Sequence, residues 1–196
     1  MYYLETDEEW NNIHPFDLWV YNKLLISRVL GYTCGPVGTT VPKPDFYIVR
    51  PSINFLGMGR FARKEWIEKD TSSFHPAEFW CEIFTGEHLS VDFHQKSADL
   101  VVRGIKDDDD PLYKWQKWEK IDQKVDFPEI LLELKGNYDW INCEFIDGNL
   151  IEVHFRRNPD FRYGNTVAIP VWDEEKVEKM TFVEDEDYLR KGFYIK

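Results

Sequence analysis

The stretch YDWINCEFIDGNLIEVHFRRNP, residues 138–159, decides the fold of this chain. Apolar and polar residues alternate on both sides of Asp147-Gly148, a dipeptide that tolerates the positive φ angles of a tight turn. The stretch is therefore predicted to form a β-hairpin. Because paired strands lie only about 4.8 Å apart, Glu144 on one strand and Glu152 on the other are expected to face each other.

The predicted hairpin gathers charged side chains on one face. Two carboxylates at this spacing repel each other unless a cation or a proton lies between them. Hard oxygen ligands of this kind suit a Mg²⁺ ion that carries phosphates. His154 and Arg156 follow Glu152 on the same face, and an arginine there can hold an anionic group. The alternative is a row of ordinary polar side chains on the solvent face of a hairpin.

The rest of the chain mixes short strands with helical stretches. Apolar residues recur at helical or at alternating spacing, and Gly and Pro separate the segments. The expected helices are 15–30, 113–121 and 128–134, and the expected strands are 46–50, 78–84, 88–94 and 98–105, with 78–84 and 88–94 joined as a hairpin. We therefore expect an α+β fold with mostly antiparallel strands.

The hairpin at 138–159 resembles the metal-binding hairpin of ATP-grasp enzymes, which have an acidic residue on one strand and E-x-N-x-R on the next. Glu144 matches the acidic position, and Glu152 and Arg156 match the second motif. His154 stands where the family usually has asparagine, and imidazole is a softer ligand than an amide oxygen. The resemblance implies that Glu144, Glu152 and His154 bind the metal and that Glu152 and Arg156 act in catalysis. The amide of Asn158 is an alternative ligand.

A second segment, FWCEIFTGEHLSVD, resembles the adenine-binding hinge of the same family. There a strand leads through a short glycine-containing connector into a strand that begins with a ribose-binding glutamate. The resemblance implies that the backbone near Glu82, Ile83 and Phe84 faces the edge of adenine. The ribose position falls on His88, and Glu87 precedes it by one residue.

Further upstream, YIVRP followed by NFLGMGRFA resembles the family's phosphate-binding strand and its glycine loop. Arg50 replaces the usual lysine, keeps its charge and adds a second donor. Gly57 and Gly59 allow backbone N–H groups to approach an anion closely. Lys23 is the candidate for a second lysine that contacts phosphate.

Together these segments predict a compact ATP-grasp-like unit over residues 1–196. The resemblance implies a small lobe with the glycine loop at 21–84, a larger lobe with the metal-binding hairpin at 85–196, and a nucleotide cleft between them. It also implies that the N-terminal domain of most family members is missing. The implied activity is an ATP- and Mg²⁺-dependent ligase that joins a small-molecule or peptide carboxylate to an amine through an acylphosphate.

Other functions stay open. Arg50, His88 and His154 depart from the family pattern, which also fits a non-catalytic module that binds a nucleotide or another ligand. A metal-dependent oxygenase would use Asp92 and His94 with His154. His88 cannot join His94 at one metal, because six residues of strand separate them by about 20 Å. In a ligase, Asp92 or His94 could instead orient the substrate.

Composition excludes several classes of protein. The 196 residues include 24 Lys and Arg against 36 Asp and Glu, a formal charge of −12, which repels nucleic acid. Trp115 and Trp118 among lysines are expected to pack in a core rather than to stack on bases. No apolar run approaches the length of a membrane span, and the acidic start is no secretory signal. Three cysteines without paired spacing fit a reducing, cytoplasmic setting.

Overall fold

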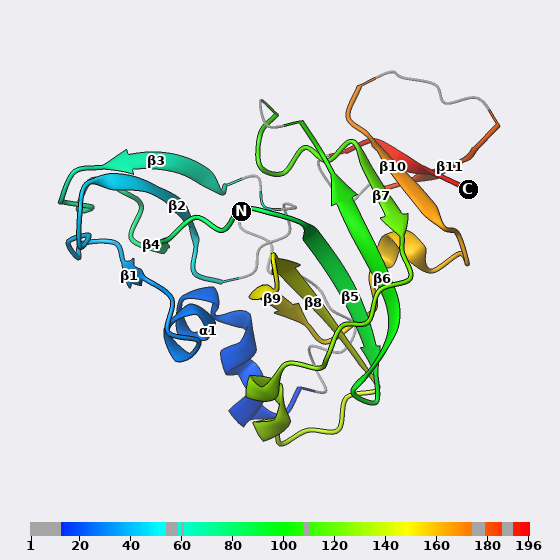
Figure 1. Ribbon diagram of the computed structural model, residues 1–196, viewed down its shortest axis with the longest axis horizontal. Coiled ribbons are helices and arrows are strands. Elements are labelled where there is room, and N and C mark those ends of the chain that lie inside the picture. Colours follow the sequence, from blue (N-terminus) through cyan, green and yellow to red (C-terminus); the bar gives the residue numbers. More distant parts are fainter. Residues whose placement is uncertain (1–12, 54–58, 60, 108–109, 174–178, 186–189) are drawn as a thin grey trace.

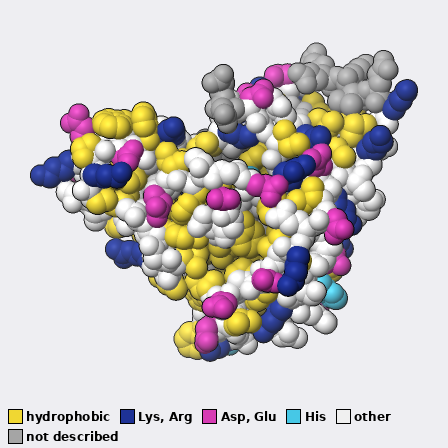
Figure 2. Space-filling view, in the orientation of Figure 1, with side chains coloured by type: hydrophobic (Ala, Val, Ile, Leu, Met, Phe, Trp, Pro, Cys, Tyr) yellow, Lys and Arg dark blue, Asp and Glu magenta, His cyan; other side chains and the backbone are white. Residues whose placement is uncertain are grey.

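The structure is a computed structural model that describes residues 13–53, 59, 61–107, 110–173, 179–185 and 190–196. Its strands form two antiparallel sheets, one of four strands and one of eight. Figure 1 shows the smaller sheet at the left and the larger sheet across the centre and right. Figure 2 shows acidic and basic side chains interspersed around the rim of this face, with apolar side chains grouped across its middle.

The four-stranded sheet has its own small core. Its strand order is β1 (Cys34–Pro36), β4 (Glu78–Cys81), β2 (Asp45–Pro51) and β3 (Arg63–Ile67). Its buried side chains are Val41, Tyr47, Val49, Ile67 and Trp80. The helix α1 (Lys23–Val29) contacts β1 and is capped by Asn22, whose side chain accepts a hydrogen bond from the N–H of Leu25.

The eight-stranded sheet holds most of the molecule. Its strand order is β11 (Thr181–Glu184), β12 (Gly192–Ile195), β10 (Val167–Val171), β7 (Lys117–Lys120), β6 (Ser97–Ile105), β5 (His88–His94), β8 (Trp140–Ile146) and β9 (Asn149–His154). In the described part of the chain, the 3₁₀ helices that accompany it are η2 (Pro15–Tyr21), η3 (Glu129–Glu133) and η4 (Pro159–Phe161).

Alternation along β5 gives this sheet two different faces. Leu89, Val91 and Phe93 are buried in the main core, together with residues from η2, α1 and η3. Successive side chains of a strand point to opposite faces, so Ser90 and Asp92 lie on the other side of the sheet. That second face is where the candidate site is found.

The β8–β9 hairpin predicted from the sequence is confirmed. Asp147 and Gly148 have φ angles of 50° and 78°, as a two-residue hairpin turn requires. The register places Glu144 directly opposite Glu152. The strands predicted at 46–50 and 98–105 correspond to β2 and β6.

The helix predicted at 113–121 is wrong, because β7 lies there. The tryptophan spacing suggested a helical period, but Trp118 is buried between Lys117 and Glu119, which pair with each other at 2.7 Å. This is the alternation of a strand, and β7 pairs with β6 and β10. The helix predicted at 15–30 is divided at Asn22 into η2 and α1, and that at 128–134 is the 3₁₀ helix η3.

The hairpin predicted from 78–84 and 88–94 is also wrong. β4 pairs with β1 and β2, whereas β5 pairs with β6 and β8, so residues 82–87 connect the two sheets. Gly86 has a φ of 129°, and a Cβ there would lie 2.8 Å from the Cβ of Asp147. The connection thus passes close to the β8–β9 turn, where the N–H of Asp147 donates to the carbonyl of Glu87 at 2.9 Å. Among the described helices, none has the length and apolar character needed to cross a membrane.

Candidate functional site

A cavity of about 760 Å³ lies between the two sheets, and all the predicted site residues that the structure describes line it. These residues are Lys23, Arg50, Gly59, Glu82, Ile83, Phe84, His88, Glu144, Glu152, His154 and Arg156. Gly57 lies outside the described residues. The volume is typical of a small-molecule site. Segments more than 100 residues apart in sequence therefore meet at one place.

Glu152 stands at the centre of a buried charge cluster. Its Oε1 lies 2.9 Å from Lys23 Nζ and 3.4 Å from His154 Nε2, and both carboxylate and ammonium are largely hidden from solvent. Burial raises the pKa of the Glu152 carboxyl, but Lys23, His154 and Arg50 outweigh it and hold the pKa well below its usual range. Glu152 is thus an anion held in place by cationic neighbours.

Glu144 has a different partner, although it faces Glu152 across the hairpin. Its Oε2 lies 3.2 Å from His88 Nε2. The imidazole of His88 in turn meets the rings of Trp115 and Trp118 edge-on, at centroid distances of 4.6 and 5.5 Å. These tryptophans line the cavity and were missed as site residues, because helical spacing assigned them to a core.

Arg50 connects the two sheets across the cavity. From β2 its Nη2 donates to the carbonyl oxygen of Ile151 on β9 at 3.0 Å. Its guanidinium also lies over the ring of Phe79, 5.3 Å from the centroid. The buried Nε has no hydrogen-bond partner among the described residues. A buried donor without a partner is costly, so an anionic ligand at this point would be favourable.

The connection between the sheets forms the edge of the cavity. The N–H of Glu82 donates to the carbonyl of Thr33 at 2.9 Å, and the N–H of Thr33 donates to Glu82 Oε1 at 2.6 Å. Phe84 packs edge-on against Tyr32, with ring centroids 4.7 Å apart. Gly59 reaches the cavity from the other side with a φ of 75°, a conformation that favours glycine.

A buried polar cluster extends the cavity beyond Glu144. It consists of Ser90, Asp92, Asn142 and Asn158, and all of these except Asp92 line the cavity. His94 does not join it, because its ring is exposed and stacks on Trp140 at 4.5 Å. Strand alternation places Asn142 on the same face as Glu144, but nothing in the sequence indicated that it meets Asp92 and Ser90.

The donor set suits Mg²⁺ only if phosphates complete it. Within the described residues, no three His, Cys, Asp or Glu side chains are arranged as a metal-binding group. Glu144 and Glu152 still offer two opposed carboxylates. Mg²⁺ in phosphate sites is held by one or two carboxylates together with phosphate and water oxygens. His154 contacts Glu152 and can orient it, as residues behind a metal ligand do.

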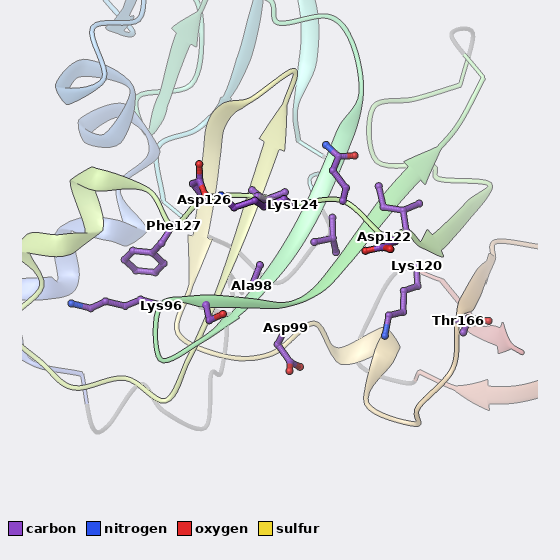
Figure 3. A pocket seen from close by; sticks show the side chains of 14 residues that line it. Lys96, Ala98, Asp99, Lys120, Asp122, Lys124, Asp126, Phe127 and Thr166 are labelled. Carbon is purple, nitrogen blue, oxygen red and sulfur yellow. Dashed lines mark ion pairs between the residues drawn. The ribbon is translucent and has the colours of Figure 1, made fainter.

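A second cavity of about 750 Å³ lies between the start of β6 and residues 120–127. Figure 3 shows lysine and aspartate side chains mixed along it, among them Lys120, Asp122, Lys124 and Asp126. Lys124 and Asp126 pair at 3.2 Å, and both are almost fully exposed. No predicted site residue lines this second cavity.

The decisive comparison is with solved structures. An ATP-grasp superfamily protein from Archaeoglobus fulgidus matches this chain with a TM-score of 0.51 and 13% identity. The match covers 90% of this chain and 63% of that protein. This chain has an ATP-grasp-like fold. The predicted fold class is thereby confirmed, although the chain spans only about 63% of the length of that protein.

Two further structures resemble the ATP-grasp-like chain less well. The ATP-grasp ligase PsnB, complexed with minimal precursor, has a TM-score of 0.40 and 15% identity over 72% of this chain and 53% of its own. The L-amino acid ligase from Bacillus licheniformis has a TM-score of 0.44 and 12% identity over 72% and 41%. No protein-family model matches the sequence, and no curated protein does.

Proposed function

We propose that this ATP-grasp-like protein is an ATP- and Mg²⁺-dependent ligase that joins a carboxylate to an amine through an acylphosphate. The main support is that residues chosen from three separate sequence segments line one cavity. A chance match of short motifs would not be expected to bring them together. The substrate classes are small-molecule or peptide carboxylates and amines.

The nucleotide is proposed to lie between the small lobe, 21–84, and the larger lobe, 85–196. The backbone of residues 82–84 would face adenine, and His88 would face the ribose. Arg50 would bind a phosphate through the Nε that has no protein partner. Gly59, together with Gly57, would bring backbone N–H groups to the same phosphates, and Lys23 would add a second positive charge.

Glu144 and Glu152 would hold Mg²⁺ together with phosphate oxygens of the nucleotide. When bound, the ion neutralises charge on the phosphates during transfer. Arg156 lines the cavity just after β9 and would hold the carboxylate and then the acylphosphate. The proposed site would catalyse the reaction by positioning the substrates and by stabilising charge with fixed charged groups. No covalent nucleophile is part of the proposal.

The proposed reaction has two steps. A carboxylate oxygen attacks the γ-phosphorus of ATP, the bond to the β–γ bridging oxygen breaks, and ADP leaves. The amine nitrogen then attacks the acyl carbon, the bond between that carbon and the phosphate oxygen breaks, and phosphate leaves as the nitrogen loses a proton. Both steps benefit from a cavity that keeps water from the acylphosphate.

A second candidate is a non-catalytic nucleotide-binding module. The observation in its favour is the ion pair between Lys23 and Glu152, which neutralises one of the two carboxylates without a metal. Such a module would bind ATP with little dependence on Mg²⁺ and would not release ADP.

Calorimetry with ATP, with and without Mg²⁺, tests both candidates. The ligase requires Mg²⁺-dependent binding and ADP release with at least one pair from a panel of acids and amines. Binding without any ADP release would favour the module, and the absence of ATP binding would contradict both. In the ligase, Glu152→Gln should abolish ADP release while circular dichroism stays that of the wild type. Unchanged turnover in this variant would discard the metal assignment.

A further inference from the structure

We propose that Asp92 is a positioning residue that holds the segment 155–158, and with it Arg156, at the cavity. The proposal rests on the ligase function proposed above, in which Arg156 holds the acylphosphate and so lies next to the phosphoryl group that ATP transfers. It assigns Asp92 no contact with substrate, because only 1% of this residue is exposed and it does not line the cavity.

One carboxylate oxygen of Asp92 is hydrogen-bonded both to the segment, at Asn158, and to β8, at Asn142. Its Oδ1 accepts a hydrogen bond from the backbone N–H of Asn158 at 2.8 Å and another from Asn142 Nδ2 at 2.9 Å. Ser90 Oγ accepts from the same Nδ2 at 2.8 Å and from Asn158 Nδ2 at 3.1 Å. Asn158 is therefore tied to β5 through its backbone and its side chain.

Arg156 lies between two fixed points. Before it, Phe155 is completely buried in the main core. After it, Asn158 is held by Asp92 and caps η4, where its Oδ1 accepts from the N–H of Asp160 at 3.0 Å. The backbone between Phe155 and Asn158 is short and held at both ends, so it can move little. This limits the positions that the Arg156 guanidinium can reach.

Burying the Asp92 carboxylate costs free energy in the folded state, which indicates that this residue has a specific role. Its Oδ2 is buried without a hydrogen-bond partner among the described residues. Burying a carboxylate with one unsatisfied oxygen destabilises a protein, and an asparagine or an apolar residue would avoid part of that penalty. A carboxylate, however, accepts stronger hydrogen bonds than a neutral amide does. Local violations of this kind are expected at functional sites rather than in ordinary cores.

Hydrogen exchange tests the anchoring directly and without nucleotide. Asp92→Ala should raise the exchange rate of the amides in 155–158 at least tenfold while the amides of β8 keep their wild-type rates. Asp92→Asn, which retains an acceptor oxygen, should give an intermediate rate. Equal exchange in all three proteins would overturn the proposal.

A nucleotide-binding cycle tests the link to Arg156. The measured quantity is the ratio of ADP to ATP dissociation constants with Mg²⁺, because ADP lacks the transferred phosphoryl group. Asp92→Ala and Arg156→Gln should each lower the ratio about tenfold, and the double variant should lower it no further. Additive losses would show that Asp92 acts elsewhere and would overturn the proposal.

Two controls separate positioning from general destabilisation. Asp17→Ala removes an equally buried aspartate that binds Lys135, Gly136 and Tyr138, and it should leave the ratio unchanged. Should Asp92→Ala not fold, Asn158→Pro removes the N–H donor at a residue whose φ of −60° suits proline, and Asn158→Ala keeps that donor. Only Asn158→Pro should then give the full loss. No ATP binding by the wild type would instead overturn the ligase function, and with it this proposal.

Discussion

Glu144 and Glu152 face each other across a hairpin, and each has a partner of its own that offsets the repulsion between the two carboxylates. Like charges directly opposed on paired strands are destabilising. Lys23 lies 2.9 Å from Glu152, and His88 lies 3.2 Å from Glu144. The side chains are thus held toward the cavity by contacts within the protein. The sites where phosphates and a metal are proposed to bind are preorganised rather than assembled by the ligand.

We predict that breaking the buried Lys23–Glu152 pair lowers the free energy of unfolding more than breaking an exposed ion pair does. Lys23→Met leaves the Glu152 carboxylate buried without its main counter-charge, which should lower the free energy of unfolding by about 3 kcal/mol. The matched control is Lys43→Met, which breaks a pair with Asp45 of nearly equal length, 2.8 Å, but with both side chains exposed. That change should cost much less, because solvent screens an exposed ion pair. Equal costs in urea unfolding would contradict the prediction.

Asp17 predicts a dependence of stability on pH away from the cavity. Burial raises its pKa, but hydrogen bonds from the N–H groups of Gly136 and Lys135 and from the Tyr138 hydroxyl outweigh it and lower the pKa. Because the folded pKa lies below that of the unfolded chain, about 3.9, the ionised form adds stability above that pH. Asp17→Asn should therefore destabilise the protein at pH 7. The difference in unfolding free energy should shrink as the pH falls from 4 through the folded pKa, and a constant difference would contradict this account.

At the scale of the element, the β8–β9 turn determines where the two glutamates meet. Gly148 has a φ of 78°, so Gly148→Ala should lower the free energy of unfolding by about 1 kcal/mol, because a Cβ disfavours the left-handed conformation. No heavy atom lies within 4 Å of that Cβ, so the cost is conformational and not steric. Asp147→Asn is the control, since asparagine tolerates the φ of 50° found there. Urea unfolding of the three proteins checks the order.

The elements that could be predicted from the sequence are those whose local signals agree. The β8–β9 hairpin combines alternation over both strands with a turn dipeptide, and both signals are local. At β7, by contrast, Trp115 and Trp118 are three residues apart, which is the spacing of a helical face, whereas the strand itself covers only Lys117–Lys120. The pairing of β7 with β6 and β10 decides between them, and that pairing joins residues far apart in sequence.

The candidate site follows the same rule. Residues within a motif, such as Glu144 and Glu152, could be predicted because the register of one hairpin places them. Asn142 and Asp92 could not be paired from the sequence, since they meet only where β5 and β8 lie side by side. The change of sheet after β4 also has no local signal, because it lies in the pairing of β4 with β1 and β2 and of β5 with β6 and β8.

At the scale of the whole molecule, the charge of the cavity differs from that of the chain. The protein has a formal charge of −12, yet basic side chains from both sheets line the cavity. Arg50 and Lys64 come from β2 and β3, and Arg103 comes from β6. The lining holds seven Lys and Arg against five Asp and Glu, so its formal charge is slightly positive, and such a local excess attracts a polyanion that the remaining surface repels. This suits a free nucleotide better than a nucleic acid.

Arg50 makes the relation between the two sheets testable, because it is proposed to bind phosphate and also donates across the cavity to Ile151. Arg50→Met should weaken Mg²⁺-ATP binding in calorimetry 10- to 100-fold, as expected for about 1.5–3 kcal/mol from a charged hydrogen bond. Adenosine, which has no phosphate, should lose little affinity. Arg63→Met is the matched control: Arg63 belongs to the same sheet and pairs with Glu78, but it does not line the cavity. It should lower stability and leave ATP affinity unchanged. An equal loss for ATP and adenosine would mean that Arg50 acts by holding the sheets together, since only a phosphate contact distinguishes the two ligands.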